Sequence, residues 1–230
     1  MATVVDPTDR APARLRGVTG AAYRAALAGS IAALSYLVVL VAYLSAAGGD
    51  VLDPTRAAYP FVWIVLSVAA LAAATAGSRR RTVPRWAAVL AAGYVLVLAW
   101  LSGQFTPGVT DVGLTVTGGL PGWGPVVVAD IAVVHLVVVP FQTIGYLVLG
   151  VLLARALSVS GNSLVAGGLG LFACAGCVLP IAAFVASAAG VPFLAGSISY
   201  LTATVAFAVT TVALVAVIVR WGARPSCSVS

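Results

Sequence analysis

Six long apolar runs, nearly free of charged residues, limit most strongly what this chain can fold into. A run of about 20 apolar residues matches the hydrocarbon thickness of a bilayer. Of the 230 residues, 62% are hydrophobic and only 8% are charged, whereas a soluble domain carries about 25% charged residues. We therefore predict an all-α, multi-pass membrane protein, because the runs lack the alternating pattern of membrane β-barrels.

The six runs predict six transmembrane helices that form one domain over residues 30–219. A polar N-terminal segment, residues 1–29, precedes this domain, and a polar tail, residues 220–230, follows it. We expect the first helix to be retained, because it is long enough to span the bilayer. The predicted helices lie near residues 30–47, 57–76, 86–102, 126–153, 164–189 and 192–219.

The arginines predict the orientation of these helices. Eleven of the twelve fall on one side, in the N-terminal segment, the second and fourth connections and the tail. The other side holds Arg56 together with three aspartates. Because basic residues stay cytoplasmic, we predict that both termini face the cytoplasm and that the protein lies in the cytoplasmic membrane. We expect the lipid bilayer to be the main partner of the protein. Nucleic acid is excluded as a partner because no soluble basic domain is present.

Tryptophans lie near several predicted helix ends, and we interpret Trp63, Trp86, Trp100 and Trp221 as anchors at the headgroup zone. The longest outer connection, residues 103–125, is rich in Gly and Pro. We interpret it as a connector, although loops of this length are often functional. Two possibilities are left open for residues 112–116, a short strand or an irregular surface segment.

Two cysteines inside the fifth predicted helix are the first candidate site. Cys174 and Cys177 are three residues apart, so they share one face of a helix. Pro180 follows, and it is expected to kink the helix and free a carbonyl beside the thiols. Soft thiolates bind copper(I) or zinc, and a CxxC pair can also cycle between dithiol and disulfide. The alternative is that both cysteines simply pack as small apolar residues.

The fourth predicted helix, near residues 126–153, adds polar candidates. His135, the single histidine, is expected near the middle of the membrane, where ionisable residues are functional candidates. Gln142 would share its helix face, whereas Asp130, five residues from His135, would not. Pro140 between them predicts a kink. His135 beside Cys174 and Cys177 would make a three-ligand copper site, while Asp130 and Gln142 are candidate pore-lining residues.

Motifs of the common enzyme classes are absent from the sequence. It has no phosphate-binding loop, dinucleotide fingerprint, HExxH or GxSxG motif. Catalysis is therefore the less favoured class, and copper is the candidate cofactor.

Several longer segments resemble an uncharacterised family of six-helix integral membrane proteins of halophilic archaea. The segments are YPFVWIVL, GYVLVLAWLSG, PGWGP, GYLVLGVLLARAL and GLFACAGCVLP. The resemblance covers the chain from the second predicted helix onward and implies that the CxxC followed by proline recurs, whereas His135 is not a fixed position. Separately, the sequence CVLP, Cys177–Pro180, is similar to a motif of membrane thiol-reductant carriers.

These observations lead to three hypotheses for function. The first is an accessory or assembly protein of a membrane redox system that handles copper or thiols through the intramembrane CxxC. The second is a small-solute transporter, in which Pro140 and Pro180 break helices around a site in mid-membrane. The third is a structural subunit of a larger complex, which would bind other membrane subunits through its Gly- and Ala-rich helix faces.

Overall fold

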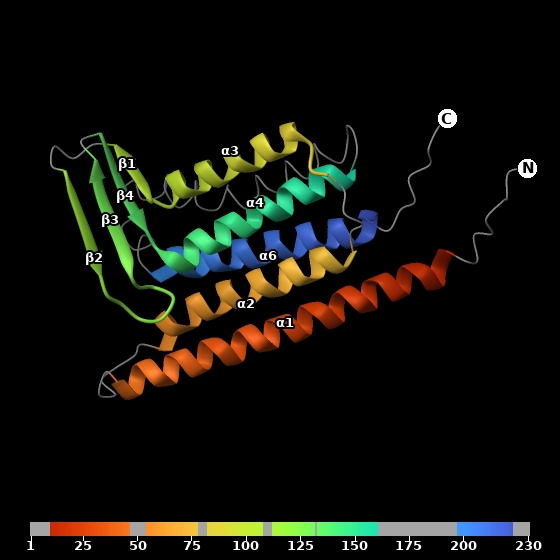
Figure 1. Cartoon of the computed structure of the whole chain (residues 1–230), viewed down its shortest axis with the longest axis horizontal. Coiled ribbons are helices and arrows are strands. Elements are labelled where there is room, and N and C mark those ends of the chain that lie inside the picture. The colour runs from red at the N-terminus through yellow and green to blue at the C-terminus, as the bar shows by residue number, and fades with distance from the viewer. Residues whose placement is uncertain are drawn as a thin grey trace, which may run out of the picture.

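The computed structural model describes residues 10–46, 54–77, 82–107, 112–131, 133–160 and 197–222. These residues form a group of helices with a small sheet at one end (Figure 1). In chain order the elements are α1 (Arg10–Ala46), α2 (Pro54–Gly77), α3 (Arg85–Leu101), β1 (Phe105–Pro107), β2 (Gly113–Thr117), β3 (Val126–Ile131), β4 (Val134–Val138), α4 (Pro140–Ser160) and α6 (Ser197–Gly222).

The helices run in two opposite directions (Figure 1). α2, α4 and α6 begin at the end that carries the sheet, which we call the outer end, whereas α1 and α3 finish there. The opposite end is called the inner end. α2 packs against α1, α4 and α6, while α3 packs against α4. α1 therefore lies at the edge of the bundle, with α2 as its main neighbour.

Four of the described helices are long and apolar enough to cross a membrane: Val18–Ala46, Arg56–Ala76, Pro140–Val159 and Tyr200–Trp221. α3 is also apolar but has only 17 residues. These helices confirm the prediction of membrane-length apolar helices, but the prediction of an all-α fold is wrong, because the chain also forms a four-stranded sheet. α1 begins at Arg10, well before the predicted start near Ser30. The fifth predicted helix, residues 164–189, lies outside the described residues.

The prediction of one helix over residues 126–153 is wrong. The first half of this segment forms the β3–β4 hairpin, and α4 begins only at Pro140. Residues 126–139 are mostly Val and Ile, whose branched side chains favour strands. Proline suits the first position of a helix and disfavours helical backbone in the preceding residue. Pro140 therefore starts α4 and does not kink it.

The sheet is antiparallel with strand order β1-β4-β3-β2, so β1 and β2 are its two edges. The register places Thr106, His135, Asp130 and Gly113 in one row across the four strands. Because side chains alternate between faces along a strand, one face carries the polar side chains and the other is apolar. The apolar face carries Leu114, Val116, Ala129, Ile131, Val134 and Leu136.

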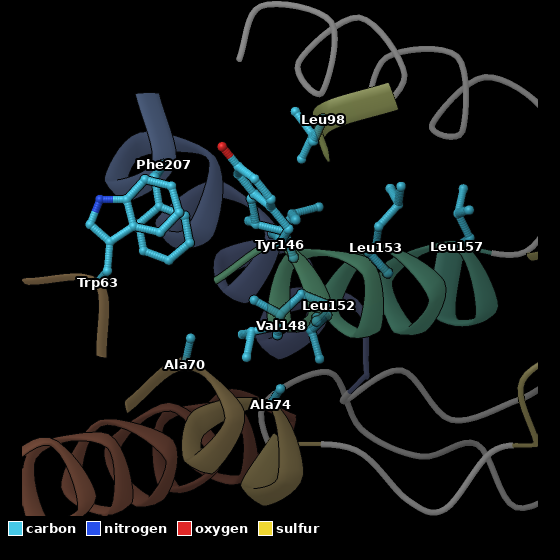
Figure 2. Close-up of a cluster of buried hydrophobic side chains, with 14 of the residues drawn as sticks. Trp63, Ala70, Ala74, Leu98, Tyr146, Val148, Leu152, Leu153, Leu157 and Phe207 are labelled. Atoms are coloured by element: carbon cyan, nitrogen blue, oxygen red, sulfur yellow. The ribbon is translucent and has the colours of Figure 1, made fainter. Parts of the chain in front are cut away.

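The core is centred on an aromatic cluster where α2, α4 and α6 meet. Figure 2 shows the Trp63 ring stacked on Phe207, with centroids 4.1 Å apart and an angle of 5° between the planes. Phe141 and Tyr146 of α4 meet Trp63 edge-on, each at 5.6 Å. The indole N–H donates to the Thr204 hydroxyl at 3.0 Å. Trp63 is only 2% exposed, so its predicted role as an interface anchor is wrong.

For Trp86 and Trp100 the anchor role stays a prediction, whereas Trp221 packs partly buried against the core cluster. Trp86 and Trp100, at the two ends of α3, are 50% and 62% exposed. Their rings are therefore free to lie in the headgroup zone of a membrane.

Candidate functional site

The sheet is attached to the outer end of the bundle by short connections. The amide of Val137 in β4 donates to the Gln104 carbonyl at 2.9 Å, which ties β4 to the turn after α3. β4 continues into α4 through Val139 alone, and β1 lies against α3. The position of the sheet is therefore set by the helices that carry it.

The loop between β2 and β3 is held by a proline inside α2. Pro60 has no N–H, so the carbonyl of Arg56 one turn earlier lacks its helical donor. The indole N–H of Trp123 donates to that carbonyl at 2.6 Å. The Trp123 ring also packs edge-on against Phe141 at 4.9 Å and Tyr200 at 5.3 Å. Trp123 therefore joins α2, α4 and α6 at the outer end.

Neighbouring residues hold the same loop from α1. The Tyr36 hydroxyl lies 3.0 Å from the carbonyls of Ala57 and Pro121, either of which can accept its proton. Gly122 has φ of +90°, and a Cβ there would overlap the ring of Pro60. Only glycine combines this backbone with so close an approach. The long outer connection is therefore a docked structural element and not only a connector.

His135 and Asp130 form an ion pair or hydrogen bond across the β3–β4 hairpin, through Nδ1 and Oδ1. They are partners in the strand register, so they share a face of the sheet. The prediction that His135 lies in a membrane helix, on a different face from Asp130, is therefore wrong. Their side chains are 31% and 25% exposed, so the pair is partly exposed. Such exposed pairs contribute about 0–1 kcal/mol to stability.

The other predicted polar residues also lie at the outer end. Gln142 is half-buried in the first turn of α4, two residues after Pro140. Asp130 and Gln142 therefore both lie at the outer end of the bundle, and their pore- or site-lining role stays a prediction. Cys174 and Cys177, with Pro180, lie outside the described residues. Among the described residues, no group of three metal-binding side chains occurs.

The two edges of the sheet differ strongly. β1 has only three residues, ends in Pro107 and lies against α3. β2 has five exposed residues, contains no charge or proline, and lies farthest from the helices (Figure 1). Leu114 and Val116 on its apolar face are 70% and 62% exposed. Among the described residues no strand pairs with the outer side of β2, so β2 is an open edge there with unpaired backbone groups.

A comparison with known families matches almost the whole described chain. The sequence model of a family of unknown function, DUF7546, covers residues 10–221. The chain belongs to this family. No curated protein and no solved structure matches it. The match includes the helices, the sheet and the loop of Trp123, so the outer sheet belongs to the family region and is not an appended segment.

Sequence reasoning missed the residues that build the outer end. Pro60 carried a usable signal, because a proline inside an apolar helix leaves one carbonyl to be satisfied by another donor. A second usable signal lies in residues 126–139, VVVADI–AV–VHLVVV. The two halves of this run mirror each other, so they can pair as strands about a central turn. The contact between Trp63 and Thr204 had no signal in the sequence, because it joins residues far apart in the chain.

Proposed function

We propose that this chain is a multi-pass accessory subunit of a membrane complex, and that its outer sheet binds a partner. The single observation that carries the proposal is the open edge of β2. Natural proteins protect exposed strand edges with charges, prolines, short strands or covering elements. β1 has such protection, whereas β2 has none among the described residues. An extended segment of a partner can add to such an edge through backbone hydrogen bonds.

Six crossings with both termini on the cytoplasmic side remain our proposed topology. α4 ends at the inner end, whereas α6 begins at the outer end (Figure 1). The proposed topology therefore needs one further membrane crossing between Ser160 and Ser197. Arg85, Arg155 and Arg220 lie toward the inner end, on α3, α4 and α6. This distribution supports a cytoplasmic inner end, with the sheet on the outer side of the membrane in the proposed topology.

The partner-binding role predicts a selective effect of charge on β2. Replacing Leu114 and Val116 with Lys should abolish co-purification of the partner in mild detergent, because both side chains lie on the open edge strand. The matched control is Val133→Lys, which places a charge on the equally exposed β3–β4 turn, where Val133 is 72% exposed. Equal partner recovery from both variants, or no co-purifying protein with the wild type, would contradict the proposal.

Handling of copper or thiols by Cys174 and Cys177 is the proposed chemical part of this accessory role. Its support is the sequence motif alone, two cysteines three residues apart that are followed by Pro180. Because His135 lies beside Asp130 on the sheet, we do not include His135 among the proposed copper ligands.

This part predicts that Cys177→Ser lowers the copper content of the purified protein, while His135→Ala leaves it unchanged. The measurement is copper per chain by atomic mass spectrometry after purification in copper-containing medium. Equal copper in wild type and Cys177→Ser would refute metal binding by the thiols, and loss of copper in His135→Ala would restore the three-ligand site.

The transporter hypothesis has less support than an accessory role. It needs a polar site near mid-membrane, whereas Asp130, Gln142 and Pro140 all lie at the outer end. At mid-depth, the described part of the bundle is filled mainly by the Trp63 cluster and by aliphatic side chains, and its buried polar side chains are the small hydroxyls of Ser67, Thr210 and Thr211.

A further inference from the structure

α1 projects beyond the other described helices at the inner end of the bundle (Figure 1). Gly29 of α1 lies against Val65 and Ala69 of α2, which fixes the relative level of these two antiparallel helices. From that level α2 continues about 12 Å to its end at Gly77, whereas α1 continues about 28 Å to Arg10. The first turns of α1 therefore stand about 16 Å past the inner end of α2.

The projecting part of α1 is basic. The apolar span of α1 begins at Val18. The helical residues before that point include three arginines, at positions 10, 14 and 16. Asp130, the single acidic residue of the described segments, lies on the sheet at the outer end. In the whole sequence, the side that the proposed topology places at the inner end has eleven arginines against two aspartates, so a large positive charge remains there.

Two further arginines lie at the inner ends of other helices. Arg85 begins α3 and is followed by Trp86, while Arg220 lies in the last turn of α6. Both arginines are exposed, and Trp86 is 50% exposed. Tryptophan favours the headgroup zone of a bilayer, so the position of Trp86 sets Arg85 beside lipid phosphates. α1 and α3 lie at opposite edges of the bundle (Figure 1), so the positive charge lies on both sides of its inner end.

The chemistry of these residues favours a lipid phosphate. All twelve basic residues of the chain are arginines, and a guanidinium can donate two parallel N–H bonds to one phosphate. Arginines attract anionic lipids when they lie within about a Debye length, near 10 Å, of a bilayer. Arg16, Arg85 and Arg220 lie inside or within one turn of an apolar helix, so the nearest phosphates are those of the bilayer. Charge on both sides of the bundle also matches a ring of surrounding lipids better than one compact macromolecule.

We propose that the inner end of the bundle binds anionic phospholipids, with their phosphates at Arg85, Arg220 and the arginines of the projecting part of α1. The proposed topology enters only through the leaflet, which is the cytoplasmic one. Binding is independent of the β2 partner, because the sheet lies at the opposite end of the bundle. The bound lipids neutralise the charge that the inner end carries.

The first test measures lipid preference in nanodiscs of equal phosphatidylglycerol and phosphatidylcholine, which expose both leaflets. Native mass spectrometry of the released protein should show more retained phosphatidylglycerol than phosphatidylcholine. Arg85→Gln with Arg220→Gln should lower this preference by up to about fivefold for each arginine removed. Arg56→Gln is the control at the outer end, where Asp50 and Asp53 precede Arg56 in the sequence. This control should keep the wild-type preference within about twofold, because those carboxylates already offset its charge.

A second variant tests the projecting part of α1. Replacing the arginines at positions 10, 14 and 16 together with Gln should lower the preference for phosphatidylglycerol at least about fivefold. All three positions precede the apolar span, so the part of α1 that packs on α2 keeps its sequence.

The remaining arms separate charge from folding. Arg85→Lys with Arg220→Lys keeps the charge and should retain most of the preference, and circular dichroism and thermal melting establish that each variant is folded. Salt at about 1 M, where the Debye length is about 3 Å, should lower the wild-type preference toward that of the Gln variants. The proposal is overturned if wild type retains both lipids equally, if either folded Gln variant keeps the wild-type preference, or if Arg56→Gln lowers it as much. Nanodiscs require neither the β2 partner nor a particular orientation in cells, so failure here is distinct from failure of the proposed function.

Discussion

Replacing Trp63 with Ala should lower the free energy of unfolding by about 3–5 kcal/mol, the usual cost of removing a buried tryptophan. Trp63 stacks on Phe207 and meets Phe141 and Tyr146 edge-on, so its loss leaves a cavity where three helices join. Packing of this kind is the main force between helices in lipid. Thr204 would also lose the donor at its hydroxyl.

The measurement is thermal unfolding in detergent, followed by loss of monodisperse protein. The expected fall in Tm is on the order of 10 °C, because 1 kcal/mol corresponds to about 2–4 °C in a protein of this size. Trp100→Ala is the control, since Trp100 is 62% exposed on α3. An equal effect of both substitutions would show that Trp63 is not part of the core.

Gly145→Ala should destabilise the protein by about 1–3 kcal/mol, although it adds only one methyl group. A Cβ at Gly145 would lie 2.6 Å from Trp63 Cζ3 and 3.2 Å from Phe207 Cε2. Neither ring can move away easily, because the two are stacked and closed in by Phe141 and Tyr146. The added methyl group must therefore push α4 away from α2.

A second glycine gives a control of opposite sign. Gly93 lies in α3, and a methyl group added there would meet none of the described side chains within 4 Å. Gly93→Ala should be neutral or stabilise by up to about 1 kcal/mol, because alanine favours helix over glycine. Chemical unfolding of the two variants side by side measures the difference. A Gly145→Ala protein as stable as Gly93→Ala would contradict the described contact of α2, α4 and α6.

The presence of membrane-length apolar helices, and the positions of α2 and α3, could be predicted because they depend on local composition. Apolar runs of about 20 residues are visible without any knowledge of their neighbours. α2 and α3 therefore begin and end within a few residues of their predicted bounds. The resemblance predicted a family without an assigned function, and the family that matches residues 10–221 is one of unknown function. The six helices and the archaeal source of that family stay predictions.

The segment around His135 could not be assigned in the same way. A run such as residues 126–139 is apolar enough for a buried helix or a strand, and hydropathy alone does not separate them. In a helix, a separation of five residues places Asp130 and His135 on different faces. In the hairpin, the same two residues face each other. One wrong choice of secondary structure thus moved the candidate site from mid-membrane to the outer end.

The core contacts were unpredictable for a different reason. Trp63 near the start of an apolar helix resembles an interface anchor, and only the approach of α4 and α6 makes it a core residue. Trp123 depends on the carbonyl that Pro60 leaves without a helical donor, which is a contact between residues 67 positions apart.

The most direct test of the central claim is cysteine accessibility on the two sides of the membrane. In a background with Cys174, Cys177 and Cys227 replaced by Ser, single cysteines are placed at Val133, in the β3–β4 turn, and at Thr82, just before α3. Intact cells are then treated with a membrane-impermeant maleimide. The account predicts labelling at position 133 in intact cells and at position 82 only after permeabilisation. Labelling of both positions under the same condition would place the β3–β4 turn and the segment just before α3 on one side of the membrane. That result would contradict the account.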